Sequence, residues 1–233
     1  MYDSLNRLYD RFNNGFEHSK YLELVFAEWA LPKNGLVLDC GCGTGELMEN
    51  LFKYGYDCTG VDSSDEMLDI AREKLENSGY AVHLVCQDLS EIDLYGAYDI
   101  VFCTLDTVNH ITDKRLLKKF FARLYNFIEP NGYFIFDIKT KSGFEKASGQ
   151  HVYDQDGDVM IMSCDFGGVH AFYDFTLFEK SDDGRYNMST DFVEERCYDP
   201  KDIKTMLSAS GLKFIGRKKY GDRLIYCYSK VFC

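Results

Sequence analysis

The stretch that decides the fold reads Leu36-Val37-Leu38-Asp39-Cys40-Gly41-Cys42-Gly43-Thr44-Gly45-Glu46. Its apolar start predicts a buried strand, and the residues from Glu46 onward follow a helical pattern. Three glycines stand at alternate positions between the two elements. Glycine adopts positive φ without steric cost and lets backbone N–H groups approach a ligand. The stretch therefore predicts a strand, a ligand-binding turn and a helix.

The same alternation continues outward along the chain. Strands are expected at 36–40, 56–61, 81–86, 98–104 and 132–138, and helices at 19–30, 46–53, 64–77 and 113–128. A further helix from Asp199-Pro200 to about 210 and strands near 212–218 and 223–229 follow. Alternation of this kind is typical of a parallel sheet covered by helices on both faces. We predict a doubly wound, Rossmann-like α/β fold with a mostly parallel seven-stranded sheet.

The segment 140–196 has a different pattern, with short strands separated by the turn signals Asp156-Gly157, Gly167-Gly168 and Asp182-Asp183-Gly184. Such spacing indicates an antiparallel β-meander. We therefore expect a binding domain made of 1–139 and 197–233, with an N-terminal arm at 1–18, and an inserted β lid at 140–196.

The charge balance limits the classes of partner. Lys and Arg total 26 against 38 Asp and Glu, which gives a formal net charge of -12. A protein that follows a nucleic-acid backbone normally carries the opposite balance, so a long nucleic acid is not expected as a partner. No apolar run approaches the roughly 20 residues needed to span a bilayer, so no membrane association is expected.

Nine cysteines and no recognisable secretory signal segment indicate reduced thiols and a cytoplasmic location. Cys40 and Cys42 do not form a C-x-x-C pair, and the five histidines lack ligand spacing. The acidic run 154–158 resembles part of a calcium loop but lacks the closing Glu of that motif. No metal site is expected.

The glycine spacing separates two kinds of nucleotide-binding turn. In Gly41-Cys42-Gly43-Thr44-Gly45 the third glycine comes one residue earlier than a dinucleotide fingerprint requires. The run Asp39-Cys40-Gly41-Cys42-Gly43-Thr44-Gly45 instead resembles the first motif of class I S-adenosylmethionine-dependent methyltransferases. The resemblance implies that the turn holds the methionine part of S-adenosylmethionine and that Asp39 lies near its ammonium group.

Three more motifs follow in the order of that family. Asp62-Ser63-Ser64-Asp65-Glu66-Met67 resembles the family's second motif, which implies that Asp62 accepts from the ribose hydroxyls and that Met67 packs on the adenine. Ser64 is expected to cap the next helix. Gln87-Asp88-Leu89 resembles the adenine-binding segment, and the strand ending at Cys103 faces the transferred methyl in the family.

The resemblance also covers the N-terminal arm, where Tyr9 is expected to close over the cofactor. The implied cofactor-binding residues are Tyr9, Asp39, Gly41, Cys42, Gly43, Gly45, Asp62, Ser63, Met67, Asp88, Leu89 and Cys103.

The acceptor side is expected just after the fourth strand, because ligands of open α/β sheets bind beyond the carboxyl ends of the strands. Asp106, Asn109 and His110 are the candidate catalytic residues there. Turn and cap chemistry is an equally good interpretation of each residue. If a general base is needed, the unperturbed pKa of His110 is the one nearer neutrality.

The sequence thus predicts a methyltransferase that uses S-adenosylmethionine. An acidic chain with an aromatic-rich lid favours a small-molecule acceptor over a polymer. Two alternatives stay open, a non-catalytic cofactor-binding regulator and a nicotinamide-dependent oxidoreductase. Neither the acceptor atom nor the oligomeric state can be inferred.

Overall fold

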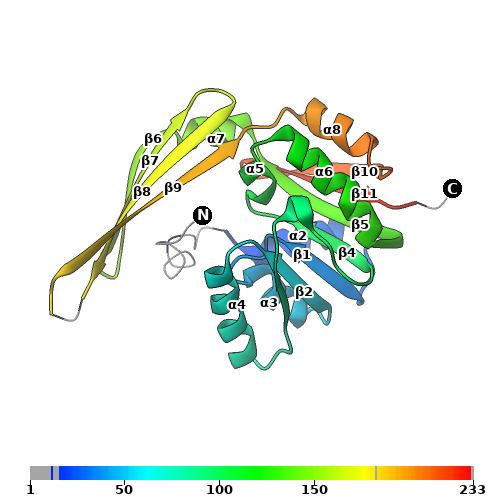
Figure 1. Cartoon of the computed structure of the whole chain (residues 1–233), viewed down its shortest axis with the longest axis horizontal. Coiled ribbons are helices and arrows are strands. Elements are labelled where there is room, and N and C mark those ends of the chain that lie inside the picture. Colours follow the sequence, from blue (N-terminus) through cyan, green and yellow to red (C-terminus); the bar gives the residue numbers. More distant parts are fainter. Residues whose placement is uncertain (1–11, 13–15, 182, 232–233) are drawn as a thin grey trace.

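The computed structural model describes residues 12, 16–181 and 183–231. Its main sheet has seven strands in the order β10-β11-β5-β4-β1-β2-β3 (Figure 1). The strands are β1 (Leu36–Cys40), β2 (Asp57–Asp62), β3 (His83–Cys86), β4 (Tyr98–Cys103), β5 (Ile128–Lys139), β10 (Lys213–Tyr220) and β11 (Arg223–Ser229). The first five run parallel, whereas β11 is antiparallel to β5 and β10 to β11. The predicted fold class is confirmed.

Helices cover both faces of this sheet. On one face lie α2 (His18–Glu28), α3 (Glu46–Lys53) and α4 (Asp65–Asn77), and on the other α6 (Lys114–Leu124) and α8 (Pro200–Ser208). Side chains alternate along each strand, so Ile100 and Phe102 of β4 join one core while Val101 and Cys103 join the other. Two buried layers therefore hold the carboxyl ends of the parallel strands at one edge.

The insertion forms a second sheet of four antiparallel strands, β6 (Gly149–Gln155), β7 (Asp158–Phe166), β8 (His170–Lys180) and β9 (Tyr186–Arg196). It extends away from the α/β body as a long ribbon (Figure 1). Gly157 and Gly168 have positive φ at two of the predicted turns. We call residues 140–196 the lid.

Several element boundaries differ from the prediction. Residues 141–147, expected to belong to the meander, form helix α7 (Lys141–Ala147), whose first turn is capped by Thr140. The short helix α5 (Thr107–His110) was not predicted. Strand β5 begins at Ile128, because an irregularity in its pairing with β4 accommodates Pro130. Within the described residues, no helix is long and apolar enough to cross a membrane.

Candidate active site

The glycine turn lies between β1 and α3 and has the predicted backbone conformation. The φ angles of Gly41, Gly43 and Gly45 are 76°, 52° and 79°. A Cβ atom on Gly41 would lie 2.4 Å from the Thr107 side chain, so a larger residue does not fit there. A Cβ atom on Gly43 would meet no atom within 4 Å. Gly43 therefore faces open space, as a backbone that receives a ligand requires.

Two carboxylates end the strands beside this turn. Asp62 at the end of β2 accepts from the N–H groups of Gly43 (2.9 Å) and Ser64 (3.0 Å). Asp39 in β1 is 1% exposed, and neither carboxylate oxygen has a hydrogen-bond partner among the described residues. Burial, with the Asp62 charge, raises the pKa of Asp39 to about 7. A cationic ligand group here would remove this cost, because an ionised carboxylate requires a partner when buried.

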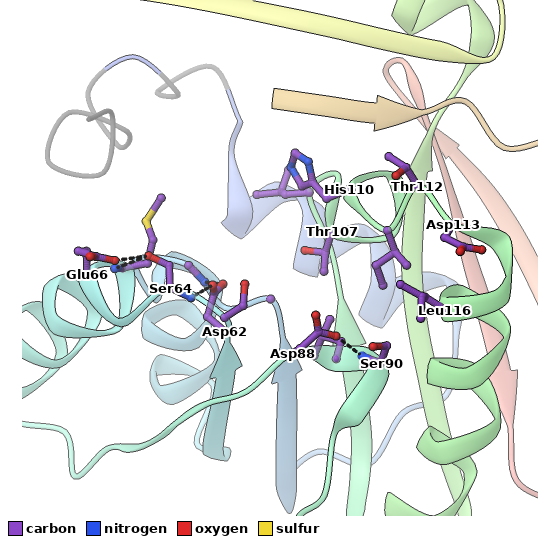
Figure 2. A pocket seen from close by; sticks show the side chains of 17 residues that line it. Asp62, Ser64, Glu66, Asp88, Ser90, Thr107, His110, Thr112, Asp113 and Leu116 are labelled. Carbon is purple, nitrogen blue, oxygen red and sulfur yellow. Dashed lines mark hydrogen bonds between the residues drawn. The ribbon is translucent and has the colours of Figure 1, made fainter. Parts of the chain in front are cut away.

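A cavity of about 390 Å³ opens beyond these strand ends (Figure 2). Its volume is in the range of small-molecule sites. Seven residues expected to bind the cofactor line it, namely Gly41, Gly43, Asp62, Ser63, Met67, Asp88 and Leu89. The lining also includes residues that the sequence did not single out as ligands, among them Glu66, Leu105, Thr107, Ile111 and Asp113.

The other expected cofactor residues lie behind this lining or outside it. Cys42 and Cys103 are buried, with 7% and 0% exposure. Gly45 precedes α3, where a Cβ atom would lie 3.2 Å from that of Ala71, so it permits close packing of α3 on α4. Tyr9 lies outside the described residues.

Helix caps shape the side of the cavity near β2 and β3. The hydroxyl of Ser64 accepts from the Met67 N–H (3.3 Å), so the predicted cap of α4 is present. Asp88 accepts from the Ser90 N–H (2.7 Å) and starts a short 3-10 helix. These bonds fix the starts of the two helices, where Met67 and Leu89 line the cavity.

The turn after β4 is strained, since Leu105 and Asp106 both have positive φ, 53° and 69°. The Asp106 carboxylate lies 2.7 Å from Arg223 and 3.3 Å from Lys139. Although burial opposes it, these two cations hold the pKa of Asp106 well below its usual range. Asp106 is therefore an ionised group whose Oδ2 atom pairs with both cations, and it is a poor proton acceptor.

Asn109, also expected at the acceptor side, is fully buried. Its amide nitrogen donates to the Arg196 carbonyl (2.8 Å), and its amide oxygen accepts from the Lys139 N–H (3.0 Å). Asn109 and Asp106 thus both hold the fold around the site.

Of the three candidate catalytic residues, His110 alone lines the cavity. Figure 2 shows its ring at the upper rim, on the side of the lid. Burial lowers the pKa of His110 to about 4, so the imidazole is neutral at neutral pH.

Sequence reasoning missed a buried ionic cluster next to this turn. Asp137 accepts from Arg223 (2.6 Å) and from the Leu105 N–H (3.3 Å), and Lys139 lies 2.7 Å from Glu195 of the lid. One signal was available, because Asp137 interrupts the apolar run of β5 and a carboxylate inside a buried strand requires a partner.

The lid aromatics are divided between two faces. Tyr173 and Phe166 pack into the inner cluster around Phe144, while Phe172 is 39% and Tyr186 50% exposed. Strand alternation places neighbours on opposite faces, so only half of these rings can face an acceptor.

Three comparisons place this geometry among known proteins. A family model described as a methyltransferase domain matches residues 37–132. A Geobacillus sp. (strain WCH70) protein that is provisionally named a methyltransferase is 25% identical over 217 residues, which are 90% of this chain and 88% of that protein.

Two solved structures have a similar fold along nearly the whole chain. The S-adenosylmethionine-dependent methyltransferase of Clostridium acetobutylicum ATCC 824 is 27% identical, with a TM-score of 0.86 over 99% of each chain. The amino pentose methyltransferase CalS10 of Micromonospora echinaspora, solved with S-adenosylmethionine bound, has a TM-score of 0.79, is 18% identical, and is matched over 99% of this chain and 98% of its own.

Proposed function

Because this chain is a class I S-adenosylmethionine-dependent methyltransferase, we propose that it methylates a small molecule held between the carboxyl ends of its parallel strands and the lid. One observation carries the proposal. The cavity opens beside a glycine turn and a buried carboxylate, Asp39, that has no partner among the described residues.

The residues present fit this cofactor. Asp39 would pair with the ammonium group and Asp62 would accept from the ribose hydroxyls, since each of its oxygens makes one hydrogen bond and can accept another. Met67 and Leu89 would enclose the adenine, with Asp88 at its amino group. When bound, S-adenosylmethionine supplies a methyl group already activated on a sulfonium, so the protein mainly has to align and desolvate the acceptor.

His110 is the residue we assign to the acceptor. It is neutral at pH 7 and lies at the cavity rim, so an imidazole nitrogen can take a proton from an acceptor that must lose one. An acceptor that reaches the site already deprotonated requires only orientation.

A small acceptor and a cytoplasmic location are supported by separate features. The net charge of -12 disfavours a polyanionic acceptor, and CalS10, whose fold is similar, is named for an amino pentose. The eight cysteines in the described part of the chain are all free thiols, which is typical of a reducing compartment.

The decisive experiment is a screen of metabolite extracts with methyl-labelled S-adenosylmethionine, followed by mass identification of labelled products. We expect a labelled small molecule with the wild-type protein and none with Gly43→Val. Calorimetry with S-adenosylhomocysteine and NADH accompanies the screen. Binding of S-adenosylhomocysteine without any labelled product would favour a regulator, and binding of NADH alone would favour an oxidoreductase.

A further inference from the structure

Lys139 ends β5 at the junction between the α/β domain and the lid. Its side chain is only 15% exposed. The Nζ atom lies 2.7 Å from Glu195 Oε2 and 3.2 Å from the Tyr173 hydroxyl, both in the lid, and 3.3 Å from Asp106 Oδ2. One ammonium group thus contacts the lid and the strained turn together.

The turn that Lys139 reaches carries part of the cavity wall. Leu105 lines the cavity, and Thr107 and His110 of α5 follow it. Two consecutive non-glycine residues at positive φ have a strained backbone, which is stable only where contacts with neighbouring groups compensate for the strain. Here Arg223 and Lys139 hold the Asp106 carboxylate.

The environment of Lys139 favours a fixed cation. Its Nζ lies 5.0 Å from the centre of the Phe144 ring and 5.2 Å from that of Tyr173. Although burial opposes it, Asp106 and Glu195 raise the pKa of Lys139, so the side chain stays charged. A charge buried between two elements has few alternative positions, because moving either element leaves it without a partner.

We propose that Lys139 is a positioning residue that couples the lid, through Glu195 and Tyr173, to the turn at Leu105–Asp106 and so sets the place of His110. The inference rests on the proposed function, because it assigns this coupling to the methyl-acceptor site. The Asn109 amide and the His110 ring also bond the main chain of β9, at Arg196 and Glu194. Lys139 differs from them because it connects the lid to the Asp106 carboxylate.

Hydrogen exchange of the full chain tests the coupling. Glu195→Gln changes only the lid, and we expect it to raise amide exchange at 105–110 by about fivefold or more, since those amides bond within the turn or to Asp137. The matched control is Glu194→Gln, the next residue of β9, whose carboxylate bonds His170 instead. It should leave exchange at 105–110 unchanged.

Two more variants identify Lys139 as the link. In a Lys139→Met background, Glu195→Gln should cause no further rise, because the two changes break one interaction. Lys139→Arg, which keeps the charge and the donors, should restore protection at 105–110. If Glu195→Gln does not fold, Tyr173→Phe removes one lid contact without changing charge and should give a smaller rise.

The inference is overturned if exchange at 105–110 in the lid variants stays near wild type, if Glu194→Gln raises it equally, or if the effects of Lys139→Met and Glu195→Gln add. The experiment needs no acceptor, so its outcome is independent of the labelling screen. Intact coupling without a labelled product would count against the proposed function only, and labelling without coupling against this inference only.

Discussion

The Asp62 carboxylate accepts a hydrogen bond of 2.9 Å from the backbone N–H of Gly43, which joins the end of β2 to the glycine turn after β1. The same side chain also holds the Ser64 N–H at the start of α4. Two segments that are expected to hold different parts of the cofactor are therefore fixed by one carboxylate. Substitutions at Asp62 should affect both the shape of the turn and the direct contact with the cofactor.

Gly43→Val should abolish cofactor binding, because the side chain would project into open space beside the backbone that receives the ligand. We expect S-adenosylhomocysteine affinity in calorimetry to fall by at least about tenfold, or ~1.4 kcal/mol. Gly55→Val is the matched control, since Gly55 also has positive φ and open space around its Cβ position but lies outside the cavity lining. It should lose similar thermal stability and keep affinity. Wild-type affinity in folded Gly43→Val would contradict the placement.

Asp62→Ala should lose about 1.5–3 kcal/mol of cofactor binding, the size of a charge-assisted hydrogen-bond loss. Asp62→Asn keeps one acceptor oxygen and should lose less. Asp57→Ala, at the exposed start of the same strand, is the control. A dideoxyribose analogue should bind wild type and Asp62→Ala with a smaller difference than S-adenosylhomocysteine does. An equal loss for both ligands would mean that Asp62 acts through the turn alone.

The raised pKa of Asp39 leads us to expect proton release when the cofactor binds. Its pKa is about 7 in the folded chain against ~3.9 when unfolded, so the folded chain binds more protons between these values and its free energy of unfolding falls as pH rises through them. An ammonium group beside Asp39 would favour the ionised form. We therefore expect S-adenosylhomocysteine to release protons near pH 7, measured as a dependence of the binding enthalpy on buffer ionisation enthalpy. Asp39→Asn should remove that dependence, and its persistence would exclude Asp39 as the source.

His110 should titrate with a midpoint near 4 in histidine-labelled NMR spectra, with His110→Gln used for assignment. The unfolded value is ~6.5, so the unfolded chain binds more protons between the two values, and His110 lowers stability as pH falls from about 6.5 to about 4. His110→Gln should flatten that part of the stability profile. A midpoint near 6.5 would show that the imidazole is not buried as the structure has it.

Replacing 149–192 with a Gly/Ser linker should separate cofactor binding from transfer. The linker joins positions about three strand spacings apart, ~14 Å, which eight residues span. Glu195 and its contact with Lys139 are kept. We expect S-adenosylhomocysteine affinity within a few-fold of wild type and loss of the labelled product. Normal labelling by the shortened protein would mean that the acceptor is held elsewhere.

The sequence by itself determined the α/β sheet and the glycine turn after its first strand. The spacing of apolar residues specifies strands and helices locally, and the turn requires glycines that tolerate positive φ. Short stretches of sequence are therefore enough to predict these elements and the turn. Gly43, Asp62, Met67 and Asp88 were expected to bind the cofactor because their motifs resemble those of class I methyltransferases, and the structure places all four in the cavity lining.

Only the tertiary structure decided what surrounds the turn after β4. Asp106 and Asn109 look like acceptor-side residues in sequence. In the structure, Asp106 Oδ2 and the Asn109 amide bond partners 30 to over 100 residues away, namely Lys139, Arg196 and Arg223. The neighbouring sequence does not predict these long-range pairs, because a buried charge is stabilised by whichever element packs against it in the fold. The protonation state of His110 could not be predicted from sequence either. Burial lowers its pKa, and its burial depends on how α5 packs against the lid and the sheet.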